Sequence, residues 1–138
     1  MQVLYVPLFM LLKQKNSKKQ GDVGLGQAIA WATSRGYTVS LPLTDSQPYD
    51  LIVDMDGKLQ RIQVKTTSYK SRSHFYVSLT TKGGNRTGAG QIKKLDPATV
   101  DFVFVVAADE EGLSTYLIPF SGEQSITLNQ DKNTFKLS

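Results

Sequence analysis

Apolar and polar residues along this chain of 138 residues recur with two periods, which predict one helix followed by a series of strands. From Val23 to Ala32 the apolar or small residues recur at helical spacing, and Gly36 ends the pattern. Asp22 is a good N-cap residue. We therefore expect a helix over roughly residues 22–35, followed by a strand over residues 37–41 and a polar loop that ends at Pro48.

Apolar and polar residues alternate most clearly in residues 49–55 and 58–67. These two segments are separated by Asp56-Gly57, a pair favoured in two-residue type I′ hairpin turns. A hairpin closed by these two residues places Asp50 opposite Gln63, with Lys65 on the same face as Gln63. The other face is predicted to be core and carries Leu51, Val53, Ile62 and Val64.

In the second half of the chain, the pattern of apolar and polar residues predicts shorter elements. We expect a strand at residues 74–79, a glycine-rich loop at 82–90, a short helical turn at 93–100 begun by Asp96-Pro97, a buried strand at 102–107, its partner at 114–118 and a weak strand at 126–128.

The length is that of one ordinary domain, and we expect a domain at residues 21–138 preceded by an extension at residues 1–20. Residues 1–12 are largely apolar, but they are too few to span a bilayer and contain Pro7, so no membrane association is expected. The sequence has no cysteine, and His74 is its single histidine, which excludes thiolate zinc sites, a cysteine nucleophile and HNH-type metal chemistry. A cytoplasmic location is the default expectation.

Charge is distributed unevenly along the chain. Residues 13–94 carry a balance of +9, whereas residues 95–138 carry a balance of −5, within a net charge of +4. Such an asymmetry indicates a half that faces a polyanion, although an unevenly charged solvated surface gives the same pattern.

The segment Pro48-Tyr49-Asp50, followed after twelve residues by Gln63-Val64-Lys65, resembles the PD-(D/E)XK motif of nucleases in a form with Gln at the (D/E) position. The segments 21–24, 66–67 and 79–86 extend the similarity to the intron-encoded homing endonucleases of cyanobacteria over roughly residues 20–120. The resemblance implies an α/β fold like that of the restriction endonucleases, with a mixed β-sheet flanked by helices in a single domain.

The resemblance further implies Mg²⁺-dependent hydrolysis of phosphodiester bonds at specific sites in double-stranded DNA. Asp50, the Gln63 side chain and the Val64 carbonyl would hold the metal, since all three offer oxygen ligands to a hard cation. Lys65 would orient or help to deprotonate the attacking water and stabilise charge on phosphorus. Taken singly, Lys65 also fits a solvated strand lysine, and Asp50 a turn residue after Pro48.

One departure from the family pattern concerns the first helix, which supplies a further glutamate in many members. No Glu precedes Glu110 here; Leu25 stands near the expected position, and Gln27 and Asp22 are the nearby polar alternatives. A site with one carboxylate predicts weak metal binding and slow activity, or its loss.

Candidate DNA-binding residues are the basic side chains that follow the motif, together with an asparagine suited to reading adenine. They are Lys70, Arg72, Lys82, Asn85, Arg86, Lys93 and Lys94. Cleavage of both strands with one site per chain predicts a homodimer or homotetramer. Two alternatives remain open: a nuclease resembling Holliday-junction resolvases, and a catalytically inactive DNA-binding module of the same fold.

Overall fold

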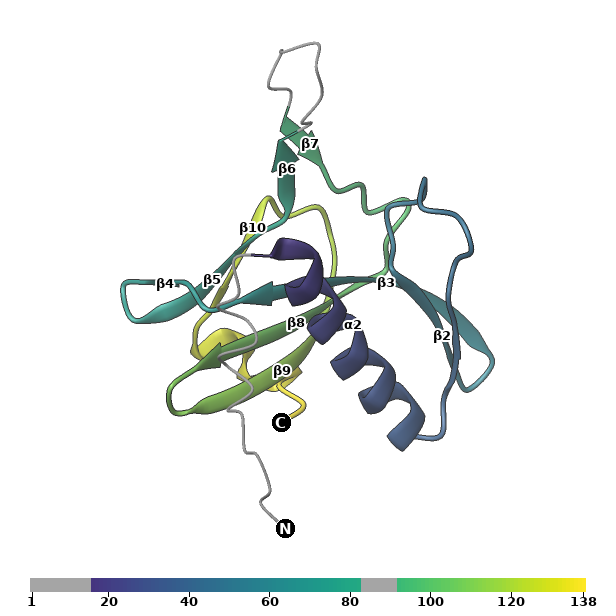
Figure 1. The fold of residues 1–138 in the computed structure, drawn as a ribbon, viewed down its shortest axis with the longest axis horizontal. Helices are drawn as coiled ribbons and strands as arrows, with labels where there is room; N and C mark the ends of the chain where they lie inside the picture. Colours follow the sequence, from purple (N-terminus) through teal and green to yellow (C-terminus); the bar gives the residue numbers. More distant parts are fainter. Residues whose placement is uncertain (1–15, 83–91) are drawn as a thin grey trace.

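The computed structural model describes residues 16–82 and 92–138 and contains a mixed five-stranded sheet at its centre (Figure 1). The strand order is β1-β2-β3-β8-β9, in which β3 and β8 are parallel and all other neighbours antiparallel. The bounds are β1 Thr38–Ser40, β2 Leu51–Met55, β3 Lys58–Thr67, β8 Phe102–Asp109 and β9 Gly112–Pro119. The predicted mixed sheet is therefore confirmed, with the hairpin strand β3 in the middle.

A single α-helix, α2 (Ser17–Ser34), flanks the sheet within the described residues. Its buried residues Gly24, Ala28 and Ala32 face a core that includes Leu51, Val53, Ile62 and Phe104. The helix begins earlier than predicted, because the side chain of Asn16, not that of Asp22, caps it by accepting the backbone N–H groups of Lys18 and Lys19 at 3.0 and 3.4 Å. The first turns are solvated and polar, so no apolar period marks them in the sequence.

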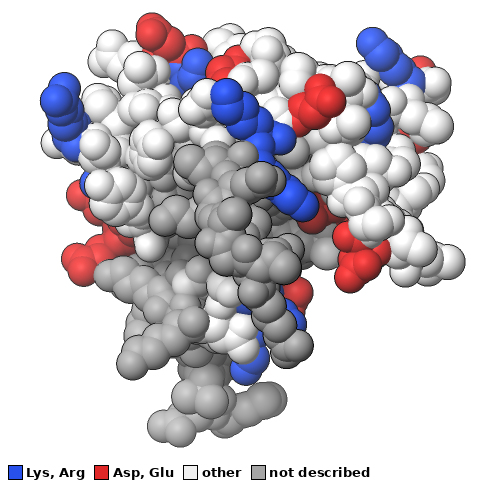
Figure 2. Space-filling model, turned by 90° about the horizontal axis from the view of Figure 1, so that it is seen from above, with Lys and Arg blue, Asp and Glu red and all other residues white. Residues whose placement is uncertain are grey.

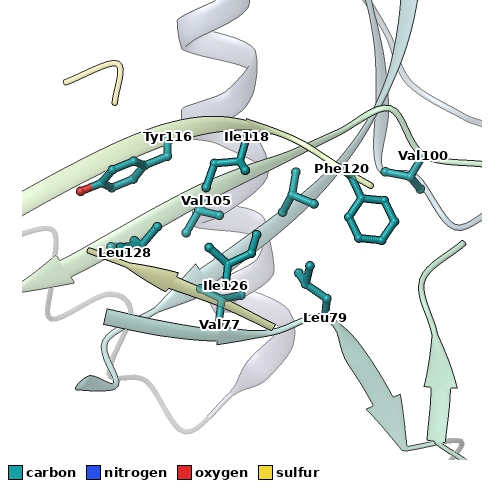
Figure 3. Packing of buried hydrophobic residues seen from close by; sticks show 11 residues of the cluster. Val77, Leu79, Val100, Val105, Tyr116, Ile118, Phe120, Ile126 and Leu128 are labelled. Atoms are coloured by element: carbon teal, nitrogen blue, oxygen red, sulfur yellow. The ribbon is translucent and has the colours of Figure 1, made fainter. Parts of the chain in front are cut away.

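The opposite face of the sheet is covered over β8 and β9 by a second sheet of order β10-β5-β4. Its strands are β4 Lys70–Ser71, β5 His74–Ser78 and β10 Ser125–Leu128. Val105 and Tyr116 from the large sheet pack against Val77 and Ile126 from the small one, and Leu79 belongs to the same cluster (Figure 3). The part of this face formed by β2 and the start of β3 lies outside this cluster.

The hairpin of β2 and β3 has the predicted register, with Leu51 opposite Ile62 and Met55 opposite Lys58. Its turn residues, Asp56 and Gly57, have φ values of 55° and 95°. Positive φ at both positions is what a type I′ turn requires, which explains the fit of an Asp-Gly pair.

The segment after Leu79 differs from the prediction. β6 (Thr80–Lys82) pairs with β7 (Ile92–Lys94) as a hairpin that projects from the body (Figure 1), so Lys93 and Lys94 lie on a strand and not in a helical turn. The turn itself is short: the side chain of Asp96 accepts the N–H of Ala98 at 2.8 Å, and its carbonyl accepts that of Thr99 at 3.0 Å. The glycine-rich loop lies outside the described residues except for Lys82.

The chain ends in a 3-10 helix, η1 (Gln130–Phe135), after which Leu137 and Ser138 pair with Thr115 at the edge of β9. No helix in the described parts of the chain is long and apolar enough to cross a membrane.

Candidate active site

A pocket of about 390 Å³ opens where the β2–β3 hairpin meets the end of the β6–β7 hairpin. Three predicted site residues, Asp50, Gln63 and Lys65, line one side of it. The other lining residues are Ser46, Gln47, Pro48, Leu79, Lys93, Lys94 and Leu95. The three motif side chains therefore share one pocket, although the regular ladder ends at Leu51 and Ile62, one pair before the predicted pair of Asp50 and Gln63.

The carboxylate of Asp50 is held by the backbone of β3. Its Oδ2 accepts the N–H of Val64 at 2.7 Å, and its own N–H donates to the carbonyl of Ile62 at 2.8 Å. The regular ladder ends at Leu51, and Asp50 bonds to β3 through its backbone N–H and its carboxylate. This bond fixes the direction of the carboxylate.

Partial burial shifts the pKa values of two charged residues of the pocket, Asp50 and Lys65. Burial raises the pKa of Asp50, although the Val64 N–H and the charge of Lys65 act in the opposite direction. Burial likewise lowers the pKa of Lys65, and the charge of Asp50 opposes that change. Both charged forms are thus partly desolvated, a state common at catalytic sites.

The other two predicted metal ligands are neighbours of Asp50, since Gln63 lines the same pocket and the Val64 N–H donates to the Asp50 carboxylate. The Gln63 side chain lies near the Val64 carbonyl, with Nε2 donating to that oxygen at 3.4 Å. A rotation of the amide by half a turn would exchange its nitrogen and oxygen. Asp50 takes part in neither of the ion pairs among the described residues, which join Arg61 to Asp101 and Lys70 to Asp109.

The first helix adds no carboxylate to this set. Gln27 lines a different pocket, beside Trp31, Arg35 and Thr115, so it is not a substitute for the expected glutamate. No group of three or more His, Cys, Asp or Glu side chains that could hold a metal occurs in residues 16–82 and 92–138. The oxygen ligands that the motif itself offers are one carboxylate (Asp50), one amide (Gln63) and one carbonyl (Val64), and Ser46 and Gln47 also line the pocket.

The candidate DNA-binding residues are only partly brought together. Lys93 and Lys94 line the pocket, whereas Lys70 lies beside the β8–β9 turn and forms an ion pair with Asp109 at 2.6 Å. Arg72 is exposed in the turn between β4 and β5. The side chain of Lys82, together with Asn85 and Arg86, lies outside what the structure describes.

Figure 2, seen from above the β6–β7 hairpin, shows Lys and Arg side chains next to the grey residues. Acidic side chains occur on the same face, so this face is mixed in charge. The uneven charge along the sequence therefore does not make this face purely basic.

Several lining residues were not predicted from the sequence. Gln47 is oriented by the hydroxyl of Thr44, which lies 3.1 Å from its Oε1, while Leu79 and Leu95 bring apolar surface from the other side of the pocket. The proximity of Ser46 and Gln47 to the motif was a usable signal. Leu79 and Leu95 carry no local pattern that distinguishes them from core residues.

Comparison with known proteins shows the family of this chain. Residues 15–134 match the PD-(D/E)XK endonucleases, and the chain belongs to this family. The structure of a bacterial homing endonuclease, I-Ssp6803I, is similar with a TM-score of 0.70 and 24% sequence identity over 88% of each chain. MepB is 12% identical over 78% of this chain and 85% of its own, with a TM-score of only 0.42. No curated protein sequence matches.

Proposed function

We propose that this protein is a metal-dependent endonuclease that hydrolyses phosphodiester bonds at specific sites in double-stranded DNA. The observation that supports this most directly is the gathering of Asp50, Gln63 and Lys65 in one pocket, with Lys93 and Lys94 also lining it. The family of the chain and its similarity in fold to a homing endonuclease point the same way.

The donor set fits Mg²⁺, which takes oxygen ligands, keeps several waters and commonly binds through one or two carboxylates. Asp50, the Gln63 oxygen and the Val64 carbonyl would hold it. When bound, the ion would supply Lewis-acid stabilisation of charge on the phosphoryl oxygens and acidify a bound water. With a single carboxylate, the affinity for the ion is expected to be low.

The remaining chemistry belongs to the chain's own residues. The Lys65 side chain projects into the pocket from the same face as Gln63, where its ammonium would stabilise the charge that grows on phosphorus as water attacks and the P–O bond breaks. Burial, which lowers the pKa of Lys65, also favours its neutral form as a proton acceptor from that water. Lys93 and Lys94 are suited to binding the flanking phosphates.

A cleavage assay on DNA fragments from the protein's own genomic neighbourhood, with Mg²⁺ or EDTA, tests the proposal. The variants Asp50→Asn and Lys65→Ala should each lose at least about 100-fold in cleavage rate, as for other groups that stabilise transition-state charge. Their binding to DNA in EDTA should stay close to that of the wild type. Lys132→Ala, outside the pocket, is the control.

Cleavage at the wild-type rate by either variant would contradict the assignment of the site. DNA binding without cleavage by the wild type would favour the inactive DNA-binding module, to which the single carboxylate lends support. Cutting of both strands would further require at least two copies of the chain, and we propose a homodimer or homotetramer for that reason.

A further inference from the structure

Arg61 and Asp101 form the most extensively hydrogen-bonded ion pair among the described residues. The guanidinium of Arg61 donates through Nε and Nη2 to the two carboxylate oxygens of Asp101, both at 3.0 Å, and through Nη1 to the carbonyl of Ala98 at 2.9 Å. The backbones also bond: the N–H of Arg61 donates to Asp101 Oδ2 at 2.8 Å, and the N–H of Asp101 donates to the Arg61 carbonyl at 2.9 Å. Five bonds thus join one strand residue to the segment 98–101.

These bonds connect the two walls of the candidate site. Arg61 lies on β3 two residues before Gln63 and four before Lys65, so the three side chains leave the strand on the same face. Asp101 ends the segment that follows β7, and this segment begins at Leu95, directly after Lys93 and Lys94. In Figure 1 the connection from β7 descends from the projecting hairpin to the start of β8.

We propose that Arg61 and Asp101 are positioning residues for DNA binding at the candidate site: they hold Lys93 and Lys94 in place around the pocket formed by Asp50, Gln63 and Lys65. This inference rests on the proposed function. Neither residue lines the pocket, and both act through the segment that joins the lysines to the sheet.

The hydrogen bonds between Arg61 and the segment 98–101 are more than is needed to pair β3 with β8. The parallel ladder already runs from Ile62 opposite Phe102 to Thr67 opposite Ala107, and the Arg61–Asp101 pair lies just before its first residues. Beyond the pair, the segment is fixed by buried Val100 and by the hydrogen bonds of Asp96. The exposed Lys93 and Lys94 pair with β6, in a hairpin that projects from the body and depends on this segment for one of its two connections to the sheet. A planar guanidinium bonded to both oxygens restricts orientation in a way that a point charge does not.

The decisive variant is Asp101→Asn, because loss of a negative charge and loss of lysine positioning predict opposite changes in DNA affinity. It removes a negative charge, so charge alone would tighten DNA binding. If Asp101 positions the lysines, affinity should fall about 5- to 10-fold in the absence of metal, and the slope of log affinity against log salt should fall by about 0.9 for each phosphate that the lysines no longer reach. Arg61→Lys, which keeps the charge but not the paired geometry, should give an intermediate loss.

A double-mutant cycle separates positioning from general stability. In the background Lys93→Ala/Lys94→Ala, Asp101→Asn should have almost no further effect on DNA affinity, because the lysines through which it acts are gone. Leu137→Ala, which shortens a side chain packed on the α2 side of the sheet, serves as the control for reduced stability and should leave affinity unchanged. Thermal melts verify that each variant is folded at the assay temperature.

Equal or tighter binding by Asp101→Asn and Arg61→Lys, with a wild type that binds DNA, would overturn this inference alone. Additive losses in the cycle would overturn it as well. Should Asp101→Asn be unfolded, Arg61→Lys in the same cycle decides the matter. A wild type that neither binds nor cleaves DNA would overturn the proposed function together with the inference.

Discussion

At the scale of single residues, the candidate site depends on how Asp50 is held. Its carboxylate is half-buried and bonded to the Val64 N–H, while Lys65 lines the same pocket without forming an ion pair with it among the described residues. The folded protein therefore keeps two partly desolvated charges close to one another. Such a site favours the binding of ions and lowers the stability of the folded protein when no ion is bound.

Stability measured against pH in EDTA should reveal this cost. Because burial raises the pKa of Asp50, the folded state binds a proton at this carboxyl more readily than the unfolded state does. The ionised carboxylate thus lowers stability above its folded-state pKa, and this effect disappears below the ordinary aspartate pKa of about 3.9. Asp50→Asn should therefore raise the Tm at pH 7, with a gain that shrinks as the pH falls toward 3.

Thermal melts of wild type and variant across that range measure the difference. The asparagine Oδ1 can still accept the Val64 N–H, so the hydrogen bond is not lost with the charge. A lower Tm for the variant at pH 7, or a difference that is constant with pH, would contradict the assigned effect of burial.

Metal affinity should respond to the residue at position 63. Gln63→Glu adds a second carboxylate to the pocket and should tighten Mg²⁺ binding roughly tenfold or more, an effect comparable to that of single groups around other metal sites. Calorimetric titration measures it, and Asn133→Asp, the same chemical change on exposed η1, is the matched control. Unchanged affinity in Gln63→Glu would indicate that no metal is held there.

At the scale of elements, the site strand depends on its contact with α2. A Cβ atom at Gly24 would lie 2.6 Å from Thr66 Cγ2 and 2.9 Å from Val64 Cγ1, both on β3. Since β-carbons do not approach other atoms so closely, the glycine lets the helix lie directly on the strand that carries Gln63 and Lys65. The two-residue turn of the hairpin fixes the beginning of the same strand.

Gly24→Ala should destabilise the fold by about 1–3 kcal/mol through overpacking, even though alanine favours a helix over glycine by about 1 kcal/mol. Gly21 and Gly26 lie in the same helix, and a Cβ there would meet nothing within 4 Å. Gly21→Ala and Gly26→Ala should therefore stabilise by about 0.5–1 kcal/mol. Urea denaturation of the three variants measures the contrast, and equal effects would show that the helix does not lie so close to β3.

At the scale of the whole molecule, DNA binding depends on which basic residues the fold places near the site. Lys93 and Lys94 meet this condition, whereas Lys70 is paired with Asp109 and lies over the ring of Phe75, 4.9 Å from its centre. The short ion pair holds the pKa of Asp109 below its ordinary value. Lys70 thus offers less free charge to a polyanion than the sequence suggests.

The salt dependence of DNA binding should reflect this placement. Lys93→Ala and Lys94→Ala should each reduce the slope of log affinity against log salt by about 0.9. Lys132→Ala and Lys136→Ala, in the acidic half of the sequence, should leave the slope unchanged, and Lys70→Ala should have a smaller effect than Lys93→Ala. Equal changes at all five positions in a titration across salt concentrations would mean that the basic residues at the pocket have no special part in binding.

The sequence by itself determined the features that depend on local periodicity and turn chemistry. The alternation of residues 49–67 and the Asp-Gly turn sufficed to predict the register that brings Asp50, Gln63 and Lys65 to one face, because a two-residue turn leaves a hairpin one register. The buried strand at Phe102 was likewise evident from its continuous apolar run. Only the tertiary structure decided that Lys93 and Lys94 line the pocket while Lys70 does not, that Gln27 faces elsewhere, and that Arg61 is tied to Asp101, forty positions away. These facts depend on contacts between elements distant in sequence, which neither the helical period nor the strand period encodes.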